Sequence, residues 1–594
     1  MAAGDMTVDT GGEFPRAIGW AHSVWHVRAA KLNLNESRGI SMSLQPKTVY
    51  PIPEETRRTA HAAFPKGTLC LRIADELGSI YSDQQFINLF PCRGQPGVSP
   101  ARLALTTILQ FVDGMSDRQA AEAVRGRIDW KYALGLELTD PGFDHSVLSE
   151  FRSRLINGQV EAQLLDTLLT KLRERNLLKA RGRQRTDSTH VLAAVRWLNR
   201  LERVGETLRA TLESIAVVAP DWLRAQALPE WYERYGSRIE NYHLPKTDSA
   251  RQEWAEMVGV DGHRLLQVID ESIEMGWLKE VPAVRILRRV WIEHYNSVND
   301  KVVMRKVEDM PSSDGQICSP YDTDARYSTK RTIEWVGYKA QLTETCDDGL
   351  PSLIVNVETT PATTPDDNIL SIVHESLKMR DLLPSQHLVD KGYTDSHVLV
   401  DSKREYGVEV IGPVAADPSW QARAGKGFDK SKFIVDWDNY VITCPSGKRS
   451  ISWQTNTYPK NGMKWEVRFS RRDCTPCPFR GNCTKAKIEP RIITLQPREY
   501  YEALQAGRKR QDTEEFREQY APRAGIEATH EQCIRRCGLR QSRYIGLVKT
   551  HFQHFITAAA INLIRINDWW CGLQPACTRR SRFIALQLPA VNMA

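Results

Sequence analysis

The chain contains 594 residues, a length that exceeds one ordinary domain and predicts two to four units. Its 41% hydrophobic and 26% charged residues are typical of a soluble globular protein. The formal net charge of +7 is only mildly basic, so charge alone does not identify a nucleic-acid partner.

The sequence does not support a secreted or membrane protein. The twelve cysteines are scattered, which predicts a reducing cytoplasm and not a small disulfide-bonded scaffold. No basic-then-apolar signal pattern occurs at the amino terminus. The longest apolar run, residues 555–564, has about half of the ~20 residues that a membrane helix needs. We therefore expect no membrane segment.

The first part of the chain divides into an irregular and a helical segment. Residues 1–45 are Gly-rich without a clear period, and we expect a disordered extension, with Met42 as an alternative start. Residues 46–178 predict an all-helical unit. Ser116 and Gln119 form a capping-box pattern that opens a helix over 117–125. The pattern fits either a helix-turn-helix or a plain packed bundle.

The hydrophobic period then changes to that of a strand. Residues 179–191 predict a short strand that ends in an acid, with four basic residues before Asp187. This makes Asp187 the first carboxylate candidate. Residues 195–319 interrupt this pattern, and their apolar residues between 198 and 215 recur at helical spacing.

Strand patterns resume after residue 330. Residues 335–342 and 353–357 predict a hairpin around the turn at 347–349. A helix over 367–380 leads to a short buried strand, 386–389, which delivers Asp390. Another helix and strand follow at 396–406 and 408–411. This alternation predicts an α/β layer with partly parallel strands, and Asp390 is the second carboxylate candidate.

Residues 415–490 form a Cys-rich unit with strands expected near 433–444 and 464–470. Cys444 begins a knuckle-like turn, and the pattern Cys474-x2-Cys477-x5-Cys483 follows. Four thiolates can close a tetrahedral Zn²⁺ site. The alternatives are four reduced thiols in a small insertion and, less favoured, an iron–sulfur cluster.

A long helix is expected to begin near residues 519–530, which include Tyr520, Arg523 and Glu527. From residue 532 to 566 no acid occurs, whereas six bases do: Arg535, Arg536, Arg540, Arg543, Lys549 and Arg565. A charge run is usually a solvated face, but a run of one sign here favours a surface that follows phosphates. Residues 567–594 form a mixed tail.

The spacing Tyr520-x2-Arg523-x3-Glu527 resembles the signature of the DDE transposases of bacterial insertion sequences. That signature continues with x6-Lys, where this chain has Ile534 followed by Arg535. The segments 319–326, 337–339 and 343–345 are also similar to this family. The resemblance extends from about Met42 to Ile566, in the branch with a helical amino-terminal domain and a split catalytic domain.

The resemblance implies an α/β fold: a ribonuclease-H-like mixed sheet, interrupted by a helical insertion and a Cys-rich insertion, after an all-helical amino-terminal domain that binds DNA. In such a sheet the first and fourth strands are neighbours, so acids on them lie side by side. The expected units are 1–45, 46–178, a catalytic domain from 179–194, 320–414 and 491–566, insertions at 195–319 and 415–490, and a tail at 567–594.

The resemblance also implies a function. Asp187, Asp390 and Glu527 would hold Mg²⁺ or Mn²⁺, because hard oxygen ligands suit these ions and two such ions support in-line phosphoryl transfer. The enzyme would cleave double-stranded DNA at the terminal repeats of an element and join the 3′-OH to target DNA. Tyr520 and Arg523 would hold the DNA end.

Arg535 and Arg540 would follow the DNA backbone, and a homodimer would pair two ends in the cytoplasm, associated with the nucleoid. Asp322 or Asp324 is an alternative to Asp187, and Glu531 to Glu527. Two other functions remain open: a structure-specific nuclease without strand transfer, and a domesticated, non-catalytic DNA-binding protein. Retention of all three acids argues against the second.

Overall fold

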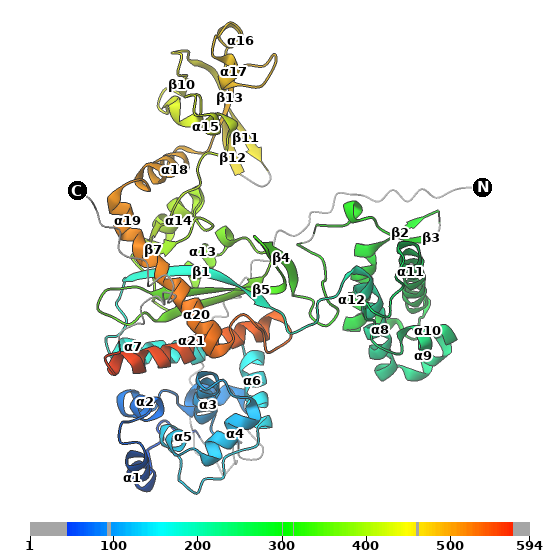
Figure 1. The fold of residues 1–594 in the computed structure, drawn as a ribbon, viewed down its shortest axis with the longest axis vertical. Helices are drawn as coiled ribbons and strands as arrows, with labels where there is room; N and C mark the ends of the chain where they lie inside the picture. The colour runs from blue at the N-terminus through cyan, green and yellow to red at the C-terminus, as the bar shows by residue number, and fades with distance from the viewer. Residues whose placement is uncertain are drawn as a thin grey trace, which may run out of the picture.

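The computed structural model describes residue 44 and residues 46–573, except 92–96, 300, 313 and 459–461. The extension expected over 1–45, apart from Leu44, and residues 574–594 of the tail therefore lie outside the described residues. Figure 1 shows a central sheet with a group of helices below it, a second helical unit to one side, and a small β-rich unit above.

The central sheet is mixed and has the strand order β4-β5-β1-β7-β8, with β6 also paired to β5. Strand β1 is antiparallel to β5 and parallel to β7, and β7 is parallel to β8. This arrangement is consistent with the ribonuclease-H-like sheet expected from the sequence. The strands are β1 (Arg183–Leu192), β4 (Arg326–Lys330), β5 (Ile333–Thr345), β6 (Ile354–Pro361), β7 (Gln386–Val389) and β8 (Glu409–Ile411).

The predicted hairpin is confirmed: β5 and β6 are antiparallel neighbours, and Gly349 takes a φ of +73° in the turn between them. The prediction that β1 ends at its acid is wrong. The strand continues to Leu192, because residues 188–192 keep pairing with β5. Asp187 therefore lies in the middle of β1, opposite Leu342.

All regular elements in the described part of 46–178 are helices. The predicted capping box is confirmed at the start of α4, where the Ser116 side chain accepts from the Gln119 N–H. The helices are α1 (Glu54–Ala63), α2 (Leu69–Leu77), η1 (Asp83–Leu89), α3 (Pro100–Val112), α4 (Asp117–Gly126), α5 (Ile128–Ala133), α6 (Ser146–Asn157) and α7 (Gln163–Glu174).

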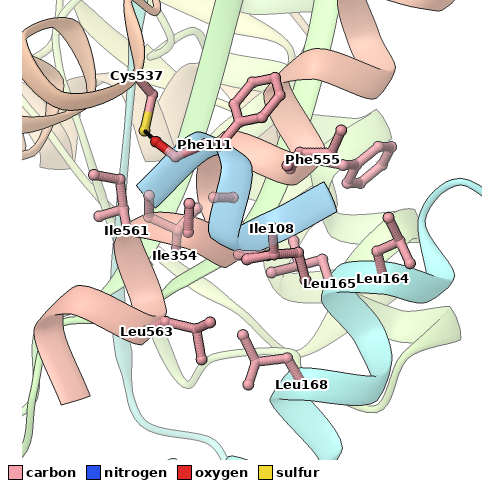
Figure 2. Close-up of a cluster of buried hydrophobic side chains, with 14 of the residues drawn as sticks. Ile108, Phe111, Leu164, Leu165, Leu168, Ile354, Cys537, Phe555, Ile561 and Leu563 are labelled. Carbon is pink, nitrogen blue, oxygen red and sulfur yellow. Dashed lines mark hydrogen bonds between the residues drawn. The ribbon is translucent and has the colours of Figure 1, made fainter. Parts of the chain in front are cut away.

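Helix α21 (Leu547–Trp570) lies between these helices and the sheet (Figure 1). Its Leu563 and Phe555 belong to one hydrophobic cluster with Leu168 of α7 and Ile354 of β6 (Figure 2). A helix that is covered on two sides carries apolar residues on both of them. This explains the apolar run at residues 555–564, which lies within α21. Among the described helices none is long and apolar enough to cross a membrane.

The single long helix expected after residue 519 is broken, and this prediction is wrong. The chain forms α19 (Glu514–Tyr520), the 3-10 turn η6 (Ala521–Gly525) and α20 (Ile526–Cys537) before α21. Pro522 lacks an N–H, and Gly538 ends α20 in the left-handed region at φ +68°.

Between β1 and β4 the chain forms a unit with its own hydrophobic core, to the side of the sheet (Figure 1). The predicted apolar stripe lies on α8. A short hairpin, β2 with β3, was not predicted. The elements are α8 (Arg200–Val218), α9 (Pro220–Gln226), α10 (Pro229–Tyr235), α11 (Asp248–Glu271), η2 (Gly276–Glu280), α12 (Pro282–His294), β2 (Tyr295–Val298), β3 (Lys301–Met304) and η3 (Val307–Asp309).

Helices α13 and α14 flank β7, and α14 follows its predicted bounds. After β8 the chain leaves the sheet, forms the β-rich unit at the top of Figure 1, and returns through α18. The remaining elements are η4 (Asp366–Asn368), α13 (Leu370–Met379), α14 (Ser396–Tyr406), α15 (Trp420–Ala424), η5 (Lys430–Lys432), β9 (Ile434–Asp436), β10 (Val441–Thr443), β11 (Ser450–Tyr458), β12 (Gly462–Phe469), α16 (Arg471–Cys474), α17 (Arg480–Cys483), β13 (Ile492–Leu495) and α18 (Arg498–Arg510).

Candidate active site

Two carboxylates lie next to each other on neighbouring strands. In the parallel pairing of β1 with β7, Thr186 is opposite Val389. Asp187 and Asp390 are the next residues on the two strands, so the register places them side by side. Asp187 is buried, and its carboxylate also accepts a hydrogen bond from the N–H of Ser188 at 2.7 Å. The Asp390 carboxylate accepts from the N–H of Gly392 at 2.7 Å.

Arg523 connects these two acids to Glu527. Its Nη2 lies 2.6 Å from Oδ2 of Asp187 and 3.8 Å from Oδ2 of Asp390. Its Nη1 lies 3.4 Å from Oε1 of Glu527, in the first turn of α20. The carboxylate of Glu527 is exposed, whereas Arg523 is largely covered. Three acids that are far apart in the sequence thus lie within reach of one guanidinium group.

A buried ion-pair network holds α20 against the sheet. Glu344 of β5 is fully buried, and its Oε1 accepts from Nε of Arg185 at 2.6 Å. Its Oε2 accepts from Thr529 of α20 and from Arg565 of α21, each at 2.6 Å. Arg185 also donates to the carbonyl of Pro522. These contacts fix the direction in which α20 presents Glu527.

The network also explains Gly525. A Cβ at this position would collide with the guanidinium of Arg185, so a side chain here would displace the arginine that supports η6. Glycine at this position leaves room for the guanidinium of Arg185 to approach the backbone.

Burial raises the pKa of Asp187 to about 6. Arg523 and the Ser188 N–H oppose this shift, whereas the neighbouring carboxylates Asp390 and Glu527 add to it. Ionising Asp187 is therefore more difficult than ionising a free aspartate. A cation that enters the group would favour the ionised form.

The sequence analysis missed His530, three residues after Glu527 on the same helix. It is buried, and its Nε2 has no hydrogen-bond partner. Ligand atoms of Asp187, Glu527 and His530 lie within 4.8 Å of one another, and Asp390 is not part of this tighter group. Burial lowers the pKa of His530 to about 4, so the ring is neutral near pH 7. The i, i+3 spacing from Glu527 was the signal available in the sequence.

The residues present fit a divalent metal ion. Carboxylate oxygens are the ligands that Mg²⁺ and Mn²⁺ prefer, and an imidazole nitrogen is compatible with Mn²⁺. One ring nitrogen of buried His530 lies within 4.8 Å of ligand oxygens of Asp187 and Glu527. A neutral imidazole nitrogen at this distance can serve as a further ligand of a cation that the carboxylates hold.

The residues expected to bind DNA lie in different surroundings. Tyr520 stacks on Phe516 with ring centroids 5.4 Å apart and is half-buried. Arg535 is exposed but pairs with Glu531 one turn earlier. Arg540 is exposed, and its Nε donates to Thr189 of β1 at 3.0 Å.

Arg565 does not belong to the expected basic surface, and that part of the prediction is wrong. Its guanidinium is largely covered and pairs with the buried Glu344. The absence of acids nearby in the sequence was misleading, because the partner comes from β5. Arg536, Arg543 and Lys549 are exposed.

The alternative acids have other contacts. Asp322 is buried and accepts from the hydroxyl of Tyr338 and the N–H of Gly546. Asp324 accepts from the N–H of Leu547, at the start of α21. Both therefore stabilise the start of α21. Glu531 pairs with Arg535.

The four cysteines of the β-rich unit, Cys444, Cys474, Cys477 and Cys483, line a separate cavity.

The raised pKa of Asp187 predicts pH-dependent metal binding. A protonated carboxylate does not bind a divalent cation, so the affinity for Mn²⁺ should fall as the pH drops below about 6, approaching tenfold per pH unit. Without metal, ionising Asp187 costs stability as the pH rises from about 4 to about 6, and bound metal offsets that cost. Titration of the protein with Mn²⁺, followed by electron paramagnetic resonance, measures the profile. A flat affinity between about pH 5 and pH 7.5 would contradict this role of Asp187.

Comparison with known proteins gives two family matches. A model described as a transposase DDE domain matches residues 443–567, and a model described as a transposase domain (DUF772) matches residues 58–154. The first range contains Tyr520, Arg523 and Glu527, and the second covers most of the helices below α21. No curated protein and no solved structure matches the chain. The two family matches support a transposase of the DDE family, which is an enzyme of the transposase or nuclease type.

Proposed function

We propose that this protein binds the ends of a mobile DNA element, cleaves DNA there and joins the freed 3′-OH to target DNA. The observation that supports this most is the convergence of Asp187, Asp390 and Glu527 on Arg523. Acids from a central strand, a strand end and a late helix form one negatively charged group around a single arginine. Such a group suits phosphoryl transfer at DNA and has no evident role in stabilising the sheet.

Asp187, Asp390 and Glu527 would hold Mg²⁺ or Mn²⁺, with His530 as a nitrogen ligand. Such ions would supply the positive charge that lowers the pKa of an attacking hydroxyl and stabilises a leaving oxygen. Arg523 offsets part of the negative charge of the three acids. Once bound cations supply positive charge there, its planar fork would be free to bind a phosphate of the DNA end.

Double-stranded DNA would contact two regions of the chain. Tyr520 and Arg523 lie beside the acids and would hold the DNA end, whereas Arg535 and Arg540 would follow the backbone. The helical segment 46–178 would recognise the terminal repeats, and a homodimer would bring two ends together. The helices of this segment pack against α21. Helix α21 is the next helix after α20, which carries Glu527. The units for end recognition and for catalysis would therefore share α21 as a common support.

A structure-specific nuclease remains the second candidate, because the same acids also support hydrolysis without strand transfer. The two functions differ in what happens to the 3′-OH. A strand-transfer assay with the element's own ends distinguishes them: joined products support a transposase, and cleaved but unjoined ends support the nuclease.

Replacement of each acid by its amide tests the catalytic assignment. Asp187→Asn, Asp390→Asn and Glu527→Gln keep the shape but remove a metal ligand. Each should lower cleavage and strand transfer at least about a thousand-fold, because metal ligation contributes several kcal/mol to the transition state. Binding to DNA ends, measured by gel shift, should change little because it depends on basic residues.

Glu531→Gln is the matched control for Glu527→Gln. It lies one turn later on α20, is exposed, and contacts Arg535 rather than the acid group. Its cleavage rate should stay within about threefold of wild type. Near-wild-type cleavage by a folded Glu527→Gln protein in Mg²⁺ would refute the assignment.

The proposed backbone contacts predict a change in salt dependence. Arg535→Ala with Arg540→Ala should weaken binding to all DNA sequences, and each lost phosphate contact should reduce the log–log salt slope by about 0.9. Fluorescence anisotropy at several salt concentrations measures the slope. Arg224→Ala is a suitable control, because Arg224 is equally exposed but lies on α9 in the unit beside the sheet. An unchanged slope in the double variant would exclude this surface.

A further inference from the structure

The β-rich unit contains a small cavity that four cysteines share. Its volume is about 30 Å³, enough for a single ion but not for an organic ligand. Cys444 follows β10, whereas Cys474, Cys477 and Cys483 come from the loop that carries α16 and α17. The fold thus brings thiols from two separate segments, about thirty residues apart, to one place.

The first segment has the backbone geometry of a sulfur-binding turn. The N–H of Gly447 donates to the Cys444 carbonyl at 2.8 Å, and Gly447 takes a φ of +78°. The N–H of Lys448 then points at the Cys444 Sγ, 3.3 Å away. A backbone donor to sulfur stabilises a thiolate and orients it, as outer hydrogen bonds do around metal ligands.

The second segment contributes no fully buried side chain to the hydrophobic cluster of the unit. Helices α16 and α17 have four residues each and contain no buried residue. One guanidinium group, that of Arg480, organises the loop by donating to the carbonyls of Cys474 at 3.3 Å, Ala486 at 2.9 Å and Glu489 at 3.0 Å. Trp437, Trp453 and Trp465 are partly buried against this hydrophobic cluster, which has six buried residues: Phe433, Ile442, Val467, Phe469, Ile493 and Leu495. So small a core usually needs a disulfide or a metal to be stable.

The charge around the cavity suits a tetrathiolate site. Four thiolates and one Zn²⁺ carry a net charge of −2, and the cavity is also lined by Lys448, Arg480 and Arg491. The only acid among its lining residues is Asp473, which lies 3.5 Å from Lys448.

We propose that Cys444, Cys474, Cys477 and Cys483 bind one structural Zn²⁺ ion that fastens the 474–489 loop to the Cys444 turn. In the described chain no three of these sulfur atoms lie within 4.8 Å of one another. Zn–S bonds of about 2.3 Å therefore draw the side chains inward by rotation about their χ1 angles. Because all four ligands come from the protein, the site is closed and has no position for substrate.

The zinc content of the full chain tests this proposal. Protein purified without chelator should contain about one equivalent of zinc, and Cys444→Ser and Cys474→Ser should lose most of it. Cys571→Ser is the matched control, because Cys571 is exposed and outside the cavity, and it should keep its zinc. Asp390→Asn should also keep its zinc, so a failure here is distinct from a failure of the proposed catalytic function.

Cobalt substitution of the wild-type protein tests the proposed site without depending on the folding of the serine variants. The wild-type protein reconstituted with Co²⁺ should show the visible bands of a tetrahedral site and a thiolate-to-metal charge-transfer band. Less than about 0.2 equivalents of zinc in zinc-reconstituted wild type, or zinc retained unchanged by Cys474→Ser, would overturn the proposal. Iron with inorganic sulfide in place of zinc would overturn it as well.

Discussion

The position of α20 over the sheet depends on the hydrogen bonds and ion pairs of one buried carboxylate, that of Glu344. It has no exposed surface, yet it binds Arg185 of β1, Arg565 of α21 and Thr529 of α20. Breaking such a buried pair typically costs about 3–5 kcal/mol, because the remaining charges stay buried. Two strands and two helices that are distant in the sequence thus meet at one side chain, and α20 has little freedom to move over the sheet.

The same network responds to pH in a defined direction. Burial alone would raise the pKa of Glu344, but Arg565 and Arg185 outweigh it and hold that pKa below its ordinary value. A lowered pKa in the folded state means that the contribution to stability is present above the unfolded pKa and is lost as the pH falls through the folded value. Asp187 behaves in the opposite way, because its pKa is raised. The Glu344 network is therefore stable at neutral pH. The ionised form of Asp187, in contrast, is favoured when positive charge is added nearby.

Local signals in the sequence predicted much of the fold. The hairpin of β5 with β6, the strand before Asp390, and α14 all have short-range patterns of apolar residues and turns, and the structure has them where expected. The strand order of the mixed sheet is consistent with the expected ribonuclease-H-like sheet. Such an order can be expected from the sequence because hairpins and crossover connections allow few topologies.

What the sequence did not predict depends on tertiary contacts. Asp187 lies inside β1 because β5 continues to pair beyond it, and no local pattern marks that length. Arg565 resembled a surface base, but its partner Glu344 lies far away in the sequence. His530 resembled an ordinary helix residue, and only the packing of α20 on β1 brings its imidazole near Asp187 and Glu527. Residues whose role depends on long-range proximity were the ones missed.

The central claim is that acids from β1, β7 and α20 form one divalent-metal site. Anomalous scattering from crystals soaked in Mn²⁺ tests it most directly, because it locates the ions independently of activity. Anomalous density at the acid group formed by Asp187, Asp390 and Glu527, next to His530, is the expected result. Density only at other acids, such as Asp322 or Glu531, or none in a crystal with ordered Asp187, Asp390 and Glu527 side chains, would contradict it.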